Sequence, residues 1–480
     1  MLRSLWDKII QDNQAEFKDQ YHRFHWVTEE EGRAAEESRR DVLSALAGNI
    51  RLAAKGTKPH FGPLSPGCEL CAQGLWSCLF VNGQCNCRCF YCPAEQNSVD
   101  MPMTNRVSFP DPGEYVEYLE KFGYRGVGLS GGEPLLTFDT TLRFAAAVKK
   151  RFGDRVFVWL YTNGTLVDAA KLTRLADAGV DEIRFDIGAT GYDLSKAGLA
   201  VGRITTVTVE IPAVPEDVPL LKKTIPAMQD MGIDHLNLHQ LRVTPYNADK
   251  LIERGYSFMP GEKVTVMESE LAALELMKFS AQNVGLPVNY CSFVYRHRYQ
   301  NAAAKVRSAA LVTKGHESLT ETGIIRTLTA KGGVDDLAGQ VRGLSKCGGD
   351  SRKWSLGGGG RELAFHPDLW SLLDFSSLNL HVTYQASSIT SALSYFNPFA
   401  ELRLSSGRSI FVERYWIADP VLLAQEDEIQ RFHNRFILGD EQVSLPGTAT
   451  WEKLTWCEQI PAGLQDYVRF AGAVNSRAVC

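Results

Sequence analysis

The feature of this 480-residue sequence that most constrains its fold is a regular alternation of short apolar runs and amphipathic stretches. The apolar runs have the length and composition of buried strands, and the stretches between them have the apolar spacing of helices. Strand–helix alternation of this kind builds βα units around a parallel sheet. We therefore predict an α/β fold, a partial (β/α) TIM-like barrel, over residues 79–295. The runs are CLFVNG, GVGLSGG, VFVWLYTNG, EIRFDIGA, ITTVTVEIPA, HLNLHQL and PVNYCSF.

The regions on either side of this alternation differ from it in composition. Residues 1–60 are polar with helical spacing, and they predict an N-terminal helical extension that acts as a solvated cap. Residues 61–84 hold turn-forming Pro and Gly residues and then cysteines, which predicts a Cys-rich metal-binding segment. Residues 296–360 predict a helical or irregular linker region that ends in four glycines. Residues 361–480 mix strand-like and helical stretches and predict a C-terminal α+β domain.

The composition excludes several classes of protein. Hydrophobic residues make up 44% and charged residues 22% of the chain, which is typical of a globular protein and not of a disordered or fibrous one. The net charge of -5 argues against a protein that binds nucleic acid through its overall charge. No run approaches the roughly 18 apolar residues of a membrane helix, and the N-terminal stretch lacks the apolar core of a signal peptide. We therefore expect a cytoplasmic protein with no membrane partner, and the charge disfavours a nucleic-acid partner.

The cysteines are concentrated in one short segment. Seven of the 11 lie between Cys68 and Cys92, and in a reducing compartment such clustering favours metal binding over disulfides. Cys85, Cys89 and Cys92 have the spacing C-x3-C-x2-C, and thiolates are the ligands that iron–sulfur clusters use. Three ligands leave one iron of a [4Fe–4S] cluster without a protein ligand. An open position of this kind separates a reactive metal site from a structural one.

A second motif, Ser130-Gly131-Gly132-Glu133-Pro134, ends the next apolar run. Glycines permit a close approach of the backbone to a ligand, and Glu133 is an acceptor suited to an ammonium group. Taken alone, the motif also fits a tight βα turn. Because both motifs follow consecutive strands at the carboxyl end of the barrel, where active sites are built, they predict one shared site.

With these two motifs, in this order and spacing, the sequence resembles the radical S-adenosylmethionine (SAM) superfamily over residues 79–295. The resemblance implies that the three cysteines hold a [4Fe–4S] cluster and that the amino and carboxylate groups of SAM bind the unique iron. It also implies an electron donor such as flavodoxin or ferredoxin. The cofactor-binding residues implied at these motifs are Tyr91, near the adenine, together with Ser130, Gly131, Gly132, Glu133 and Pro134, of which Gly131, Gly132 and Glu133 receive the SAM ammonium.

Later strand ends add weaker candidates for the same site. Asn163 and Asp186 follow two further strand runs and are predicted to reach SAM or substrate. The alternatives are a plain turn at Asn163 and a helix cap or barrel salt bridge at Asp186. Glu210 and Ile211 occupy the strand position that packs around adenine and ribose in members of the superfamily.

The resemblance implies a definite chemistry. Reduction of SAM at the cluster breaks the S–C5′ bond and gives methionine and a 5′-deoxyadenosyl radical, which removes hydrogen from an unactivated C–H bond. The protein must deliver one electron at a low potential and hold the target bond close. We expect the barrel to act mainly by positioning.

Four further cysteines predict an accessory metal. Cys68, Cys71 and Cys78 read C-x2-C-x6-C, and C-x2-C is the spacing of zinc and rubredoxin-like iron sites. Cys87, the spare thiol of the cluster loop, is the predicted fourth ligand. We expect one mononuclear iron or zinc ion with a structural role, which fixes the loop to the mouth of the barrel, in preference to a catalytic metal. The alternative is that these thiols are buried or free.

The segment 63–93 is similar to a branch related to pyruvate formate-lyase activating enzymes. It is also similar to the cobalamin-dependent methanogenesis-marker enzyme that C-methylates an arginine of methyl-coenzyme M reductase. These similarities imply a peptide or protein substrate and C-methylation with cobalamin, although the cobalamin motif D-x-H-x-x-G is absent. The alternatives are a small-molecule or RNA substrate without cobalamin and, in another class, a non-catalytic iron–sulfur or zinc module for electron transfer or scaffolding.

Two residues after the barrel strands are predicted to be catalytic. Cys291 ends the last apolar run at the barrel mouth, where it is expected to contact substrate or relay a radical, and its alternative is a small core residue. Tyr295 opens an aromatic and basic cluster with Arg296, His297 and Arg298. This cluster suits a substrate carboxylate or phosphate, and its alternative is the solvated start of a helix.

Overall fold

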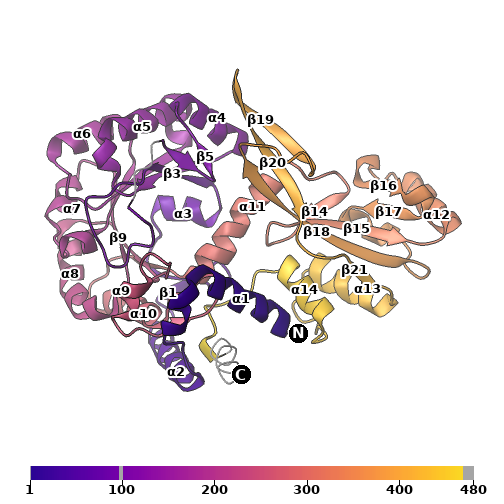
Figure 1. Ribbon diagram of the computed structural model, residues 1–480, viewed down its shortest axis with the longest axis horizontal. Coiled ribbons are helices and arrows are strands. Elements are labelled where there is room, and N and C mark those ends of the chain that lie inside the picture. The colour runs from indigo at the N-terminus through magenta and orange to yellow at the C-terminus, as the bar shows by residue number, and fades with distance from the viewer. Residues whose placement is uncertain (1, 97–100, 469–480) are drawn as a thin grey trace. The chain divides into compact units, whose positions relative to one another are not determined.

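The computed structural model describes residues 2–96 and 101–468 (Figure 1). The other positions, including 469–480 of the predicted C-terminal domain, lie outside the described residues. The chain divides into two compact units. The barrel unit consists mainly of Arg3–Thr104 and Ser108–Gln300, and the C-terminal unit mainly of Asn301–Ile460.

A parallel sheet forms the centre of the barrel unit, and each predicted apolar run becomes one of its strands. The strand order is β1-β2-β13-β10-β9-β8-β7-β6-β3-β4-β5, and every neighbouring pair from β13 to β3 is parallel. The predicted α/β fold is therefore confirmed. The parallel strands are β3 (Trp76–Asn82), β6 (Gly126–Gly131), β7 (Phe157–Thr162), β8 (Glu182–Phe185), β9 (Thr206–Pro212), β10 (His235–His239) and β13 (Val288–Cys291). The outer strands are β1 (Ile50–Ala53), β2 (Lys58–Phe61), β4 (Met103–Thr104) and β5 (Val107–Ser108).

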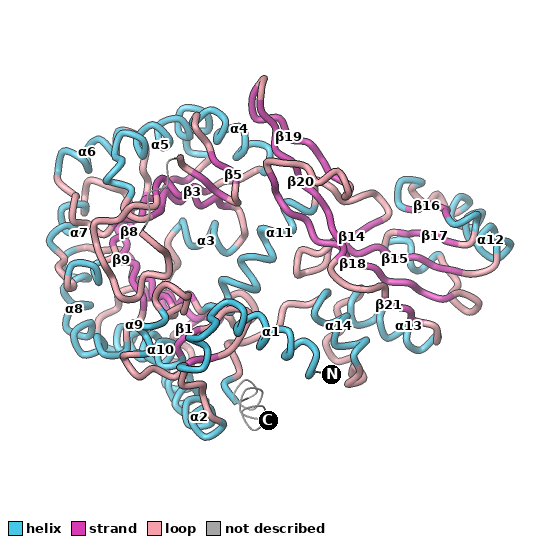
Figure 2. Tube along the Cα trace, in the orientation of Figure 1, coloured by secondary structure: helices cyan, strands magenta, loops and turns pink. Residues whose placement is uncertain are grey.

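Helices cover the outer face of this sheet (Figure 2). Their ends follow local rules: Asp111 caps α4 by accepting from the Gly113 N–H, and Gly123 ends that helix with a left-handed φ of 63°. These helices bury one face each against the sheet, as in other βα architectures. They are α4 (Pro112–Phe122), α5 (Phe138–Phe152), α6 (Ala169–Asp177), α7 (Ser195–Ala200), α8 (Val218–Met231) and α10 (Met267–Asn283).

One helix, α3 (Pro66–Ala72), lies inside the curve of the sheet (Figure 1). It fits there because glycines stand at the positions where α3, the neighbouring strand β6 and the Trp159 side chain approach one another. A Cβ added at Gly67 would lie 2.4 Å from Arg184 Nη2, and one added at Gly126 would lie 2.9 Å from the Trp159 ring. The C-x2-C pair of α3 is therefore brought into the barrel interior.

The N-terminal extension packs against the insertion between β10 and β13. It contains α1 (Leu2–Phe17), a 3-10 helix at Lys18–Arg23 and α2 (Glu29–Ala45), and the insertion contains α9 (Ala248–Ile252), β11 (Phe258–Met259) and β12 (Thr265–Val266). Together they bury one apolar core, which we call the N-terminal cluster. The extension is therefore a packed element and not a solvated cap. The cluster consists of Ile10, Phe17, Tyr21, Phe24, Leu241, Val243, Ala248, Leu251, Tyr256, Phe258, Val264 and Val266.

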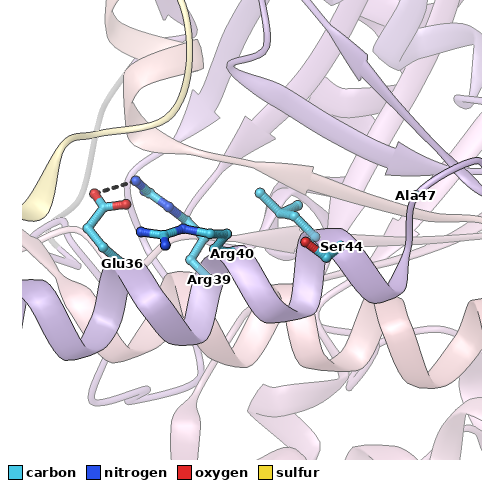
Figure 3. Close-up of a pocket in the computed structure, with 6 residues that line it drawn as sticks. Glu36, Arg39, Arg40, Ser44 and Ala47 are labelled. Carbon is cyan, nitrogen blue, oxygen red and sulfur yellow. Dashed lines mark hydrogen bonds and ion pairs between the residues drawn. The ribbon is translucent and has the colours of Figure 1, made fainter.

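A pocket of about 450 Å³ opens along α2 (Figure 3). Arg39 within it pairs with Glu36 at 2.5 Å and with Glu270 of α10 at 2.8 Å. These contacts anchor α2 on α10, and no residue of the predicted site lines the pocket. Its lining residues are Glu36, Arg39, Arg40, Leu43, Ser44 and Ala47.

The C-terminal unit is built on an antiparallel sheet with the order β16-β17-β15-β18-β20-β19, to which β14 and β21 are added. The predicted C-terminal α+β fold is confirmed, and the region 296–360 also contributes strands to this sheet. The strands are β14 (Glu317–Leu319), β15 (Ile325–Lys331), β16 (Trp354–Gly357), β17 (Glu362–Phe365), β18 (Asn379–Thr390), β19 (Phe399–Ser405), β20 (Arg408–Trp416) and β21 (Val421–Leu423). The helices are α11 (Asn301–Ala309), α12 (Val334–Lys346), α13 (Glu426–Phe432) and α14 (Ala449–Glu458).

Across the described ranges, every helix is too short or too polar to span a bilayer.

Candidate active site

The two sequence motifs meet at the carboxyl ends of β3 and β6. The Gly132 N–H donates to the Asn82 carbonyl at 2.9 Å, and the Glu133 N–H donates to the Gln84 carbonyl at 2.7 Å. A Cβ at Gly131 would lie 2.1 Å from the Asn82 oxygen, and one at Gly132 would lie 2.0 Å from the Gln84 oxygen. The glycines are required because the two backbones touch. The entrance of the cysteine loop is thus fixed on the glycine motif.

Glu133 is fully buried and joins the ends of two strands. Its carboxylate accepts from the Leu135 N–H at 3.0 Å, from the Thr162 hydroxyl at 2.9 Å and from the Asn163 N–H at 2.7 Å. Burial raises the pKa of this carboxyl group. In the structure Glu133 therefore holds β6 against β7, and its predicted contact with an ammonium group stays a prediction.

The remaining residues of the glycine motif have structural contacts. Ser130 is hydrogen-bonded to Cys78 on the neighbouring strand. The Pro134 carbonyl accepts from the buried Thr141 hydroxyl at 2.8 Å, which fixes the start of α5. Both residues therefore help to hold the glycine motif in place through contacts with neighbouring elements.

The three predicted cluster ligands lie on one partly buried loop after β3. None of Cys85, Cys89 and Cys92 forms a disulfide. The Asn163 amide lies 3.7 Å from the Cys85 sulfur, and the Cys87 N–H donates to that sulfur at 3.4 Å. Hydrogen bonds to sulfur are among the contacts that tune iron–sulfur clusters.

Burial favours the thiol form of two cysteines in the metal-free loop. Burial raises the pKa of Cys89 to about 12 and also raises the pKa of Cys92. The Cys89 thiol is therefore protonated at neutral pH in the metal-free protein, and metal binding would release its proton. Within the described ranges, no three His, Cys, Asp or Glu side chains converge on a point that a single metal ion would occupy. A multi-iron cluster requires wider spacing, because each thiolate binds a different iron.

Tyr91 and Asp186 are joined across the site. The Tyr91 hydroxyl lies 2.9 and 3.1 Å from the two carboxylate oxygens of Asp186. Burial raises the pKa of Asp186 to about 6. Gly188 leaves the necessary room, since a Cβ there would lie 2.8 Å from the Tyr91 hydroxyl. The structure thus brings both predicted residues together and orients the aromatic ring of the loop.

A buried ionic chain crosses the barrel interior. Arg184 pairs with Glu182 and with Glu210, each at 2.8 Å, and Glu210 also contacts His239 at 2.6 Å. Burial alone would raise the pKa of Glu210, but Arg184 and His239 outweigh it and hold that pKa below its usual range. Glu210 therefore has protein partners in the interior. Ile211 is 1% exposed, and strand alternation places it on the opposite face, away from the cysteine loop.

The interior thiols form a group that differs from the predicted accessory set. Cys68 accepts from Asn237 at 3.3 Å and from Asn289 at 3.6 Å, and Asn289 also reaches Cys291 at 3.4 Å. The structure thus groups Cys68 with Cys291. Of the predicted set Cys68, Cys71, Cys78 and Cys87, Cys78 faces Ser130 on β6 and Cys87 lies on the cluster loop beside Cys85. The accessory metal stays a prediction.

The predicted residue Tyr295 also belongs to the interior. It is fully buried, and its hydroxyl lies 3.9 Å from the Cys71 sulfur, which also accepts from Gln300 at 2.6 Å. Lys58 lies 4.2 Å from the Tyr295 ring centre and donates to Cys291 at 3.2 Å. Tyr295 and Cys291 therefore share one environment.

Sequence reasoning missed three residues that shape the site. Arg184 is visible in hindsight as a charge inside the apolar run EIRFDIGA. Lys58 carries no such signal, because it lies outside every motif, yet it is fully buried. Asn247, also fully buried, donates to the Tyr91 carbonyl at 3.1 Å from 156 residues away. Only the fold reveals the last two.

The comparisons with known proteins agree with this geometry. The model of the radical SAM superfamily matches residues 79–197. A protein of Methanocaldococcus jannaschii that is named as a glycyl-radical enzyme activating enzyme is 31% identical over 304 residues, which cover 60% of this chain and 80% of that protein. A GTP 3′,8-cyclase of Listeria monocytogenes is 29% identical over 129 residues, or 26% of this chain and 37% of that protein.

The solved structure of methylornithine synthase is also similar to part of this chain. It is 15% identical, the match covers 58% of this chain and 77% of that one, and the TM-score is 0.32. From the long match to the Methanocaldococcus protein, together with the match of the family model to the part of the barrel that holds both motifs, we conclude that this chain belongs to the radical SAM superfamily.

Proposed function

We propose that this radical SAM enzyme cleaves SAM reductively and removes a hydrogen atom from an unactivated C–H bond of a peptide or protein. The observation that carries the proposal is the contact between the cysteine loop and the glycine motif, which places three unpaired thiols at the carboxyl end of the parallel sheet. Cys85, Cys89 and Cys92 would hold the cluster. When bound, the cluster supplies one electron at low potential, and SAM supplies the adenosyl group that accepts the hydrogen.

The chain's own residues position and shield this site. Glu133 fixes the ends of β6 and β7, and Asn163 directs an amide N–H toward the Cys85 sulfur. Phe90 and Tyr91 cover the loop on the side of the N-terminal cluster. Exclusion of water strengthens the electrostatic interactions inside the site and limits side reactions of a radical.

The name of the Methanocaldococcus relative supports a macromolecular substrate, since an activating enzyme of that kind acts on another enzyme. It also favours the predicted branch related to pyruvate formate-lyase activating enzymes. An electron donor such as flavodoxin or ferredoxin belongs to the same proposal. C-methylation with cobalamin rests on the sequence resemblance alone, and a corrinoid absorption band in protein purified without oxygen would support it.

The proposal is tested with protein reconstituted anaerobically with iron and sulfide. Addition of SAM and a low-potential reductant should give 5′-deoxyadenosine, measured by mass spectrometry. Cys85→Ser should abolish the product, whereas Cys347→Ser should not, because Cys347 is an exposed thiol at the end of α12. Equal product from Cys85→Ser, or none from cluster-loaded wild type, would contradict the proposal.

The substrate class needs a separate experiment. A glycine-containing peptide with deuterium at the glycine α-carbon is incubated with the loaded enzyme. Transfer of deuterium into 5′-deoxyadenosine would support hydrogen removal from a peptide, and the undeuterated peptide is the control. Product formation without deuterium transfer would speak against this peptide class.

A further inference from the structure

The aromatic residues of the cysteine loop rest on the N-terminal cluster. Phe90 and Tyr91, which lie between Cys89 and Cys92, both pack against this apolar core. The cluster is formed by the N-terminal extension and by the insertion after β10. Two segments that lie more than 200 residues apart in the sequence therefore both contribute to the core against which this short loop packs. Neither segment contains a sequence motif of the superfamily.

Asn247 ties this support to the loop backbone. The residue is fully buried, and its amide nitrogen donates to the Tyr91 carbonyl at 3.1 Å and to the Arg242 carbonyl at 3.0 Å. Its amide oxygen accepts from the Thr244 N–H at 2.8 Å. A primary amide matches this arrangement because it offers two donors and an acceptor in one plane.

Arg254 contacts the loop from the same insertion. Its guanidinium carbon lies 3.5 Å from the centre of the Phe90 ring, a cation–π contact. Glu216 pairs with the same guanidinium group at 2.9 Å. The arginine is therefore fixed in the orientation in which it covers Phe90.

The N-terminal extension is bound to the insertion after β10 by several specific contacts. The Asn13 amide donates to the Gly261 carbonyl at 2.9 Å, and Lys263 pairs with Glu16 at 2.9 Å. The Phe24 and Phe258 rings lie 4.7 Å apart, and the Phe258 N–H donates to the His25 carbonyl at 2.8 Å. These contacts join α1 and the β11–β12 hairpin into one body.

We infer that the N-terminal cluster sets the conformation of the cysteine loop and that Asn247 and Arg254 are the positioning residues that transmit it. The role of these contacts in cluster binding rests on the proposed function. The contacts themselves do not, because they exist in the metal-free chain. By fixing the loop before metal binds, they reduce the reorganisation that cluster binding requires and limit the access of water to it.

The test measures thiol alkylation in the full-length, cluster-free protein by mass spectrometry. In Asn247→Ala we expect Cys89 and Cys92 to react about tenfold faster, the change that loss of one buried hydrogen bond allows. Cys68, which is 3% exposed, serves as an internal reference for global folding, and exposed Cys347 gives the upper limit. Unchanged rates at Cys89 and Cys92, or an equal rise at Cys68, would overturn the inference.

Arg254→Gln is the second variant, because a surface arginine is removed without a cavity. We expect about a threefold faster reaction of Cys89 and Cys92, since the cation–π contact is the weaker of the two. Arg174→Gln is its matched control: Arg174 lies 4.8 Å from the Phe138 ring and pairs with Asp139, far along the sequence from the loop. Equal effects of the two variants would also overturn the inference.

A third measurement distinguishes positioning from general stability. In reconstituted protein, Asn247→Ala should raise the midpoint potential of the cluster, because water reaches it more easily. Ser280→Ala, which removes a buried hydrogen bond to the Leu286 carbonyl elsewhere, should leave the potential unchanged. Failure of the proposed SAM cleavage would leave the alkylation result intact, so the two proposals fail separately.

Discussion

The two groups of cysteines in the barrel unit differ in how their sulfur atoms are satisfied. Among the described residues, the Cys89 thiol is hydrogen-bonded to Tyr91 and the Cys92 thiol to the Ala94 carbonyl, and both thiols are partly buried. The interior sulfurs of Cys68, Cys71 and Cys291 accept from side-chain amides, a phenol and an ammonium group. The comparison teaches that cysteine spacing alone does not separate thiols that await a metal from thiols that the fold already uses.

The largest expected effect is on iron content, and it tests the difference between the two groups of cysteines directly. Cys89→Ala should reduce the iron content of the reconstituted protein from about four per chain to background, because one cluster ligand is lost. Cys71→Ala should retain that iron, because the hydrogen bonds from Gln300 and Tyr295 account for the Cys71 sulfur. Iron and sulfide analysis measures both. Loss of one further metal equivalent in Cys71→Ala would instead support the predicted accessory metal.

The next effect concerns the charges near the interior thiols. Arg184→Met leaves Glu182 and Glu210 buried without their partner and should lower the free energy of unfolding by about 3 to 5 kcal/mol. Lys58→Met should cost about 1 kcal/mol or less, because no carboxylate is left unpaired. Denaturant unfolding of the cluster-free protein compares the two. Similar losses for both variants would mean that Lys58 has an ionic partner in solution.

A smaller effect tests the contact between the loop and the glycine motif. Gly132→Ala should lower the free energy of unfolding by about 1 to 3 kcal/mol, because its Cβ would overlap the Gln84 carbonyl. Gly343→Ala in α12 should instead raise it by up to about 1 kcal/mol, since its Cβ meets no atom and alanine favours helices. Thermal unfolding measures both changes. A neutral Gly132→Ala would show that the loop entrance moves freely.

One expected effect depends on pH and vanishes in acid, and it concerns Asp186. Its pKa is raised to about 6 by burial, so the folded state favours the protonated carboxyl group. The stability that this group contributes is complete below about pH 4 and is lost as the pH rises through about 6. Asp186→Asn should therefore come close to wild type at pH 4 and be more stable by about 3 kcal/mol at pH 7.5, because a pKa shift of about two units corresponds to that difference. Unfolding of the cluster-free protein at several pH values measures this, and a difference that does not change with pH would contradict it.

The sequence predicted the parallel strands and the two motifs because both are local patterns. Alternation and glycine spacing are properties of neighbouring residues, and each predicted run became a strand. The partners of Cys68 and Cys291 could not be predicted in this way, because Asn237 and Asn289 reach Cys68, and Lys58 reaches Cys291, from strands far away in the sequence. The strands β14 to β16 were missed for a related reason. The strands β14 and β16 have only three and four residues, and the longer β15 carries polar residues such as Arg326, so their pairing and not their periodicity defines them.

The packing of the N-terminal extension was missed because its apolar residues suit any amphipathic helix. Phe17 and Phe24 are buried only because the insertion after β10 offers them a surface. Likewise, the contacts of Glu133 with Thr162 and Asn163 could not be predicted, because both partners lie about thirty residues away at the end of the next strand, while its predicted contact with an ammonium group stays a prediction. Burial and long-range pairing therefore decide what motif residues do.

The helix inside the barrel has one more consequence. Because α3 contacts β6 and β7 and sits against Trp159 and Arg184, it occupies part of the space inside the curve of the sheet. Its place depends on the absence of a side chain at Gly67, because a Cβ there would collide with the Arg184 guanidinium and the Glu182 carboxylate. A larger residue at this one position would push the helix, and both of its cysteines, away from that buried ion pair.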